Sequence, residues 1–342
     1  EAKDSLAETD SSGKFVRTPS LFRNKISREE GARFPPAKGR YHLYISHGCP
    51  WANRCHAAIR MKRLEKVIGM SVVHPTWQET APGKDKHIGW TFRDPDDAPV
   101  VPVSGVGAID CKGCVPDTVN GAKTVRELYE IAAVTLAQSF QPVLWDKEEG
   151  TIVNNESEEI LRMIDSGSSS PGESATPRLY PEDFVSEIEE INSWVYDNIN
   201  NGVYKCGFAK SQAAYDEAVK NLYKHLDKAE EILSKQRYLC GNRLTEADVR
   251  LFMTLVRFDE VVYVVYFKCN KKPISAYPHL TNYMRDLFQT PGLGESVDME
   301  HIKRHYFTSH PSLNAYSVIP SGPGVLEDLK QPHNRDTFAH KV

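Results

Sequence analysis

The stretch "YHLYISHGCPWANR" (residues 41–54) joins a strand-like run to the start of a helix. Residues 41–46 are aromatic and β-branched, which predicts a strand. The helix expected over residues 49–67 has Cys49 at its N-cap, followed by a proline at the first helical position, where its missing N–H costs nothing. Residues 67–73 are apolar and predict a buried strand, so this region predicts a βαβ unit with a parallel strand pair.

Three roles are open to Cys49: a nucleophile, half of a metal site, or a small apolar core residue. At the first turn of a helix a thiol meets unpaired backbone N–H groups and the positive end of the helix dipole, which favour the thiolate. Such placement lowers a thiol pKa from about 8.5 towards roughly 3.5–7.5. The position three residues later is Ala52, so no resolving cysteine follows. We interpret Cys49 as a reactive monothiol that needs an external thiol, rather than as a structural cysteine.

The rest of the first domain continues the same pattern. After a Pro- and Gly-rich loop come an expected helix, two short strands and another helix, at residues 124–137, 141–146, 151–154 and 155–165. This order is that of a thioredoxin-like fold. Residues 166–181 have the composition of a linker, and the chain beyond them shows mostly helical periodicity. One of these helices begins at Thr245, where Asp248 at the third position predicts a capping box.

Two short motifs in this domain suit a peptide ligand. Pro142 precedes the strand "VLW", and in thioredoxin-like folds a proline at this place leaves the backbone of the next residue, here Val143, able to pair with an extended peptide. "NES" (155–157) precedes an apolar helix, so Ser157 would favour a carboxylate and Glu156 an ammonium group. Taken alone, Pro142 is more simply a proline at the start of a strand, and "NES" is more simply an ordinary helix cap.

Composition limits the partners and the compartment. The chain has 342 residues, enough for two domains, and a net charge of −4, which argues against nucleic acid or an anionic membrane as the main partner. No apolar run reaches the length of a membrane span. The polar N-terminus is not a secretory signal, although a removed transit peptide stays open. Seven scattered cysteines fit a reducing compartment, so we expect a cytoplasmic protein, or an organellar one after transit-peptide removal.

Several stretches together resemble the glutathione transferase superfamily, and within it the glutathionyl-hydroquinone reductases, also called the Xi class. They include "CPWA" (49–52), "PVLWD" (142–146), "NESEEI" (155–160), "GVYKCGFA" (202–209) and "HYFTSHPSLN" (305–314). The resemblance runs from about residue 41 to the end of the chain. It implies an α/β thioredoxin-like N-terminal domain followed by an all-α C-terminal domain, the glutathione transferase architecture.

The expected division of the chain follows from this resemblance and from the composition. It comprises an N-terminal extension (1–40), the thioredoxin-like glutathione-binding domain (41–166), a linker (167–182), an all-helical substrate domain (183–308) and an extended C-terminal tail (309–342).

The resemblance also implies residue roles. Cys49 would be the nucleophile, and Tyr204 and Tyr306 would line the quinol pocket and assist catalysis by hydrogen bonding to ring hydroxyls. The implied glutathione-binding residues are Trp90, Val143, Glu156 and Ser157. The implied reaction is glutathione-dependent reduction of S-glutathionyl-hydroquinones through a mixed disulfide of the cysteine. Glutathione would be a co-substrate, no metal or nucleotide is indicated, the substrates would be aromatic glutathione conjugates, and the family implies a homodimer.

The sequence departs from this family at three places. Tyr266 stands where a histidine is common. Gln138 lies near a position where a basic residue often contacts glutathione, which puts one contact in doubt. Residues 93–123 form a longer segment than usual and carry Cys111 and Cys114. A zinc site usually needs four ligands, and no second cysteine pair has matching spacing. We interpret the pair as two inert thiols, with a loop disulfide or a regulatory dithiol as alternatives.

Two further expectations concern the first helix and the function. Arg54, Lys62 and Arg63 are expected on the solvated side of that helix. An omega-like thioltransferase or dehydroascorbate reductase would use the same cysteine without the two tyrosines. A non-catalytic protein that binds glutathione conjugates is the alternative from another class.

Overall fold

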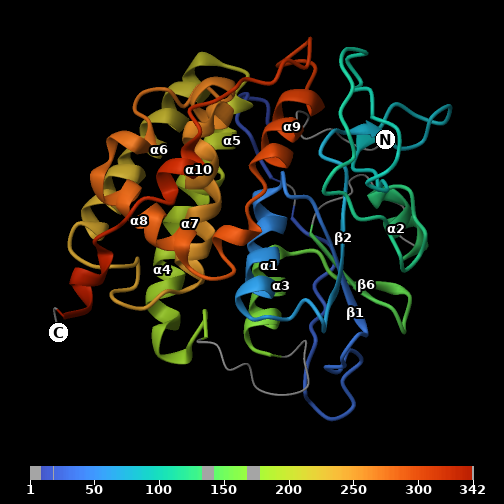
Figure 1. The fold of residues 1–342 in the computed structure, drawn as a ribbon, viewed down its shortest axis with the longest axis horizontal. Helices are drawn as coiled ribbons and strands as arrows, with labels where there is room; N and C mark the ends of the chain where they lie inside the picture. Colours follow the sequence, from blue (N-terminus) through green and yellow to red (C-terminus); the bar gives the residue numbers. More distant parts are fainter. Residues whose placement is uncertain (1–8, 18, 133–141, 168–177, 341–342) are drawn as a thin grey trace. The chain divides into compact units, whose positions relative to one another are not determined.

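The computed structural model describes residues 9–17, 19–132, 142–167 and 178–340, which form two compact units (Figure 1). Of the described residues, the first unit comprises 19–132, 142–167 and 296–319. The second unit consists of Glu8–Arg17, Pro177–Glu295 and Pro320–Val342. Each unit is described by itself below.

The first unit is built on a four-stranded mixed sheet. Its strands are β1 (Tyr41–Ile45), β2 (Gly69–Val72), β5 (Val143–Asp146) and β6 (Thr151–Asn154), in the order β2-β1-β5-β6. The first pair is parallel and the other two pairs are antiparallel, with Leu43 opposite Met70 in β2 and opposite Leu144 in β5. Every residue of β1 is buried, as expected for a strand with neighbours on both edges and helices on both faces. The predicted strands are confirmed, including the turn between β5 and β6.

Helices cover both faces of this sheet. Figure 1 shows α1 and α3 on one face and α2 on the other. The helices of the unit are α1 (Pro50–Met61), α2 (Val125–Ile131), α3 (Ser157–Asp165) and α9 (Met299–Ser309); β3 (Gln78–Glu79) and β4 (Ile88–Gly89) form a small separate hairpin. The predicted first helix ends six residues early, because Arg63 adopts a positive φ of 56° that a helix cannot continue. The predicted end of α2 lies outside the described residues.

The second unit is mainly helical in its described part, as the sequence predicts for the region before residue 309. The tail was expected to be extended, but it forms helical turns at Val325–Leu329 and Arg335–His340. Its α-helices are α4 (Val185–Val195), α5 (Gly202–Gly207), α6 (Gln212–Leu233), α7 (Glu246–Arg257), α8 (Pro278–Gln289) and α10 (Val325–Leu329). Two π-helical segments follow α4 and α7, η3 (Tyr196–Asn200) and η4 (Phe258–Tyr266), and short 3-10 turns are η2 (Glu182–Phe184), η5 (Ile274–Ala276) and η7 (Arg335–His340). A further 3-10 turn, η6 (Gly294–Ser296), begins in the second unit and ends on the first residue of the segment 296–319. The fold class, a mixed α/β domain joined to an all-α domain, is confirmed.

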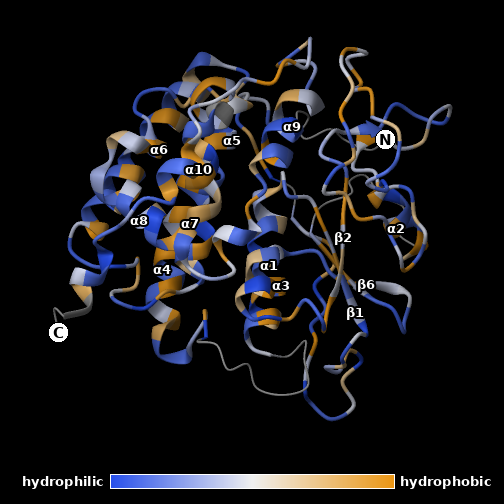
Figure 2. Cartoon of the chain, in the orientation of Figure 1, coloured by the Kyte–Doolittle hydropathy of each residue, from blue (hydrophilic) through white to orange (hydrophobic). Residues whose placement is uncertain are grey.

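Helix α7 is the core of the helical unit. All twelve of its residues are buried, and hydrophobic residues occupy much of its length (Figure 2). The predicted capping box is present between Thr245 and Asp248 at its start. The Asp248 carboxylate also accepts hydrogen bonds from the Leu239 N–H (2.9 Å) and the Tyr283 hydroxyl (2.8 Å). Burial raises the pKa of Asp248 to about 6 despite these donors. One carboxylate thus organises the entry to the central helix.

The compact units differ from the expected domain ranges in three places, one of which is the expected tail, divided between the two units after Ile319. Residues 8–17 belong to the helical unit, where the Lys210 N–H donates to the Gly13 carbonyl at 3.0 Å. Residues 296–308, expected in the helical domain, belong to the unit that contains the sheet. Compact units need not coincide with folding domains, so the expected boundaries stay a prediction.

The connection between β1 and α1 is packed tightly against α9. A Cβ atom built on Gly48 would lie 2.6 Å from the Cβ of His305 in α9, far closer than carbon atoms approach in proteins. The Gly48 N–H donates to the Ser46 hydroxyl at 3.1 Å, and the Cys49 N–H donates to the Ser46 carbonyl at 3.2 Å. Glycine is therefore required here by space.

The sequence contains no apolar run as long as a membrane span, and the helices can be compared with that expectation. Within the described ranges, none of the helices is both long enough and apolar enough to cross a bilayer.

Replacing Asp248 by alanine should destabilise the helical unit strongly. The change leaves the Leu239 and Thr245 N–H groups and the Tyr283 hydroxyl without their acceptor in a buried place. Since each buried unsatisfied group costs about 1–3 kcal/mol, we expect a loss of at least about 3 kcal/mol in the free energy of unfolding, measured by denaturant titration. Asp248→Asn, which keeps one acceptor oxygen, should lose less; equal losses would contradict this account.

Gly48→Ala should destabilise the sheet-containing unit by about 1–3 kcal/mol, because the new methyl group overlaps His305 and either α9 or the turn must move. Gly202→Ala is the matched control: its Cβ would meet only ordinary contacts at 3.5 Å or more, inside a helix. The control should be neutral or stabilising, since alanine favours helices over glycine. Thermal unfolding of the two variants checks the contrast, and a neutral Gly48→Ala would refute the steric constraint.

Candidate active site

Cys49 lies where the sequence places it, between the end of β1 and the first turn of α1. It is the N-cap residue, with an extended backbone (φ −79°, ψ 116°) and Pro50 as the first helical residue. Its carbonyl accepts the first helical hydrogen bond, from the Asn53 N–H at 2.9 Å. Its side chain makes no capping hydrogen bond, and the sulfur lies at the end of the helix that favours an anion.

Cys49 also differs from the other cysteines in its exposure. All seven cysteines lie in described residues and none forms a disulfide; six are buried and Cys49 alone is half-buried. Burial raises the pKa of the Cys55 thiol in the same helix, and it raises the pKa of Cys114 and Cys240 to about 12. These buried thiols stay protonated near neutral pH, so the position of Cys49 is the one suited to thiolate chemistry.

Trp90 and Val143 belong to the hydrophobic cluster against which Cys49 packs. Val143 is the first residue of β5 and lies opposite Tyr44 of β1. Trp90 is buried. Its ring centre lies 4.4 Å from the ring centre of His305 and 5.6 Å from that of Trp77. The structure therefore brings two of the four predicted glutathione-binding residues together with the candidate nucleophile. Their role in binding glutathione stays a prediction.

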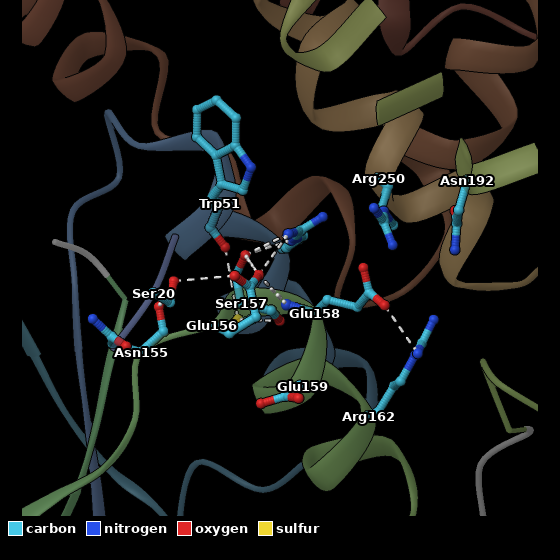
Figure 3. A network of polar contacts seen from close by, with 12 residues as sticks. Ser20, Trp51, Asn155, Glu156, Ser157, Glu158, Glu159, Arg162, Asn192 and Arg250 are labelled. Carbon is cyan, nitrogen blue, oxygen red and sulfur yellow. Dashed lines mark hydrogen bonds and ion pairs between the residues drawn. The ribbon is translucent and has the colours of Figure 1, made fainter. Parts of the chain in front are cut away.

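Glu156 and Ser157 lie in a polar network at the start of α3 (Figure 3). Glu156 is the N-cap, and its carboxylate accepts hydrogen bonds from the Ser20 hydroxyl (3.0 Å) and the Glu158 N–H (3.3 Å). Its side chain is 27% exposed, whereas Ser157 is 1% exposed. Glu156 thus presents negative charge to solvent at the place where the sequence predicts an ammonium-binding group. The predicted roles of both residues remain predictions.

The expectation that Arg54 and Lys62 lie on the solvated side of the first helix is wrong. Arg54 is 3% exposed, and its guanidinium donates through Nε (3.0 Å) and Nη2 to the hydroxyl of Ser157. The Lys62 ammonium is buried in an ion pair with Asp165, at 2.8 Å. Arg54 and Lys62 are buried against residues of α3, and the spacing of apolar residues along the sequence does not reveal this. Arg63, beyond the helix end, is exposed as expected.

The two predicted tyrosines occupy different surroundings. Tyr306 lies in α9, in the unit that contains Cys49; it is 2% exposed and its ring centre is 5.0 Å from that of His305. Tyr204 lies in α5 of the helical unit, among Phe15, Phe208 and Phe267. The Arg17 guanidinium lies 5.6 Å from the centre of the Tyr204 ring. Both positions are compatible with aromatic recognition, and their catalytic roles stay predictions.

The segment 93–123 is docked onto the sheet and onto α9. Val115 pairs with Val72 at the edge of β2, through reciprocal hydrogen bonds of 3.0 and 2.9 Å. Asp110 forms an ion pair with Arg304 of α9 at 2.9 Å. Cys111 and Cys114 are buried in one small cluster with Val100, and burial raises the pKa of both thiols. Both cysteines are thus buried without a disulfide, and the interpretation that the pair is inert stays a prediction. Gln138 lies outside the described residues.

Three residues near this site are missing from the predicted site residues: Ser20, Arg54 and His305. Ser20 reaches Glu156 from the N-terminal segment, and Arg54 reaches Ser157 from α1. His305 packs on Gly48 and Trp90, and its Nδ1 lies 3.0 Å from the Pro75 carbonyl. These contacts join residues far apart in the sequence. The one signal available was that "HYFTSH" belongs to a family stretch.

Comparison with known proteins places this geometry in a family. Residues 212–286 match the family model of the glutathione S-transferase C-terminal domain. Glutathionyl-hydroquinone reductase YqjG of Escherichia coli K12 is 43% identical over 332 residues, covering 95% of this chain and 93% of YqjG. An omega-like glutathione S-transferase of Schizosaccharomyces pombe is 40% identical over 319 residues, covering 91% of this chain and 94% of its own.

Solved structures agree. The Xi-class glutathione transferase of Natrialba magadii superposes with a TM-score of 0.81 at 42% identity, covering 92% of this chain and 89% of that one. The glutathione-bound structure of E. coli YqjG gives a TM-score of 0.81 at 41% identity and covers 92% of this chain and 96% of its own. Cys49 thus lies at the start of α1, next to the end of a strand of the mixed sheet. The chain belongs to the Xi class of the glutathione transferases.

Proposed function

We propose that this protein reduces S-glutathionyl-hydroquinones to hydroquinones at the expense of glutathione. The observation that carries the proposal is the half-buried Cys49 sulfur at the N-terminal end of α1, packed on the cluster that includes Trp90 and Val143. The names of the relatives and the glutathione bound to E. coli YqjG support glutathione-dependent reduction. Aromatic glutathione conjugates are the substrates we propose.

The reaction proceeds in two steps. The Cys49 thiolate attacks the sulfur of the glutathionyl group, forming an S–S bond and breaking the bond between sulfur and the ring carbon. The electron pair of that bond goes to the ring carbon, which takes up a proton, and the hydroquinone leaves. A second glutathione then attacks the mixed disulfide as thiolate, releasing glutathione disulfide and restoring Cys49. Two glutathionyl sulfurs are oxidised and the ring carbon is reduced, and the scheme predicts ping-pong kinetics.

The two tyrosines have separate parts in this proposal. A phenol hydroxyl donates a hydrogen bond to a ring oxygen of the substrate, on which negative charge develops as the bond to sulfur breaks. Tyr306 lies in the same unit as Cys49, and its buried ring is packed beside His305. Tyr204 is held within an aromatic cluster of the helical unit. We propose that both line the quinol pocket. The homodimer stays a prediction from the family resemblance, and the cytoplasmic location stays a prediction from the scattered cysteines.

An omega-like thioltransferase is a second candidate, favoured by the name of the S. pombe relative, an omega-like glutathione S-transferase. It would use Cys49 in the same way on simple mixed disulfides. The reductase must stabilise an aromatic leaving group, whereas the thioltransferase need not.

Cys49→Ser should lower turnover of a glutathionyl-hydroquinone by at least about 10³-fold, because the hydroxyl is not ionised at neutral pH and cannot form the mixed disulfide. Cys114→Ser is the matched control and should retain most of the activity, since that thiol is buried. Mass spectrometry after exposure to the substrate should find one glutathione on wild-type Cys49 and none on the variant. Substantial activity of Cys49→Ser would eliminate the mechanism, and an inert Cys49 in the wild type would favour the non-catalytic binder.

Tyr306→Phe and Tyr204→Phe should each lower kcat for the glutathionyl-hydroquinone by about 10–100-fold, because each removes one donor to the developing charge. Turnover of a mixed disulfide between glutathione and an aliphatic thiol should change less than about threefold, since it has no aromatic leaving group. Tyr316→Phe is the control, because that side chain is exposed. If both substrates are affected equally, or neither is, the thioltransferase interpretation gains over the reductase.

A further inference from the structure

A carboxylate oxygen of the chain itself lies among the donors at the start of α3 (Figure 3). Oε1 of Glu156 is 3.3 Å from the Glu158 N–H nitrogen, 3.5 Å from the Ser157 hydroxyl and 3.8 Å from Nη2 of Arg54. These distances are long for hydrogen bonds, so the oxygen is held more by charge than by tight bonds. These donors therefore form a position that accepts an anion. Glu156 Oε1 occupies it in this structure and can be exchanged for another anion.

Arg54 determines what the Ser157 hydroxyl can do there. Nε and Nη2 of Arg54 both donate to Ser157 Oγ, and a hydroxyl oxygen has two lone pairs. With both lone pairs taken, the remaining hydrogen of Ser157 must donate, and Glu156 Oε1 is the acceptor in this structure. An ordinary serine can accept or donate, but this one is restricted to donating. It therefore favours a group that only accepts hydrogen bonds, such as a carboxylate.

The charge of Arg54 acts in the same direction. The guanidinium is 3% exposed, and a buried cation requires a nearby anion to offset its lost hydration. Among the described residues, the Glu156 carboxylate is the anion that faces it, at 3.8 Å. A ligand carboxylate in the same place would take over that role. Glu156, whose other oxygen is held by Ser20, would then be able to face an ammonium group.

We propose that Arg54 is a positioning residue of the glutathione site: it acts through Ser157 to select the α-carboxylate of the γ-glutamyl group, which displaces Glu156 Oε1. This inference rests on the proposed function, because it presumes that the ligand is glutathione. Cys55 of the same helix also reaches this place, with its Sγ donating to the Ser157 carbonyl at 3.3 Å. Helix α1 thus carries the nucleophile at its first turn and the group that orients the γ-glutamyl site one turn later.

The test compares two ligands by calorimetry in reducing buffer: glutathione, and its analogue with the γ-glutamyl α-carboxylate converted to a carboxamide. The wild type should bind glutathione at least about tenfold more tightly than the amide, because hydrogen bonds to charged groups are worth that factor or more. Arg54→Met should weaken glutathione binding about tenfold while changing the Kd of the amide less than about threefold. Arg54→Lys should retain part of the preference, and Arg63→Met, on an exposed arginine near the same helix, should retain all of it.

A double-mutant cycle tests whether Arg54 acts through Ser157. In a Ser157→Ala background, Arg54→Met should change the glutathione Kd less than about threefold, because the hydroxyl it orients is gone. Circular dichroism checks folding, and if Arg54→Met does not fold, Arg54→Lys and Ser157→Ala carry the comparison of the two ligands.

The outcomes separate this inference from the function. Equal weakening of both ligands by Arg54→Met would show a merely structural role and overturn the inference, as would full additivity in the cycle. A wild type that binds glutathione and turns over the conjugate but does not prefer the acid to the amide refutes only the role of Arg54. A wild type that does not bind glutathione at all refutes the proposed function itself.

Discussion

The close approach of Gly48 to His305 is the constraint on which the surroundings of Cys49 depend. No side chain fits at residue 48, so the turn from β1 to α1 lies directly against α9. Through His305 the same helix touches Trp90 and the carbonyl of Pro75. The nucleophile is therefore held between a strand end and a helix from the far end of the chain. Because packed side chains do not deform freely, this contact fixes where the first turn of α1 begins.

Buried polar ties hold α1 to α3 at both ends. At the first end Arg54 donates to the Ser157 hydroxyl, and at the other Lys62 and Asp165 form an ion pair at 2.8 Å. Buried charges of this kind contribute little net stability, but losing one partner is expensive. These contacts form only at particular distances and angles. Two helices joined by both of them are therefore held against rotating or sliding past each other. The helix that carries Cys49 and the helix that carries Glu156 therefore keep one register.

The segment 93–123 strengthens the same arrangement from the other side. Asp110 binds Arg304 of α9, and the Lys112 carbonyl lies 2.6 Å from His301 Nε2 in the same helix. Gly113 is required there, because its φ is +76° and a Cβ would lie 2.8 Å from His301 Nε2. The two cysteines flanking this turn are buried under it. The segment acts as a brace between the edge of β2 and α9.

Local patterns were sufficient for the sheet, for the N-cap position of Cys49 and for the capping box at Thr245, because each depends on residues within a few positions of one another. The family resemblance supplied the expected site residues, whose roles the fold alone does not test. The positions of Arg54 and Lys62 were mispredicted, since a charged residue on a helix reads as solvated unless its distant partner is known. The sequence by itself determined the local conformation that places a thiol at a helix start. Only the tertiary structure decided which buried charges, and which helix from the end of the chain, surround it, because burial of a polar group depends on partners that packing brings together.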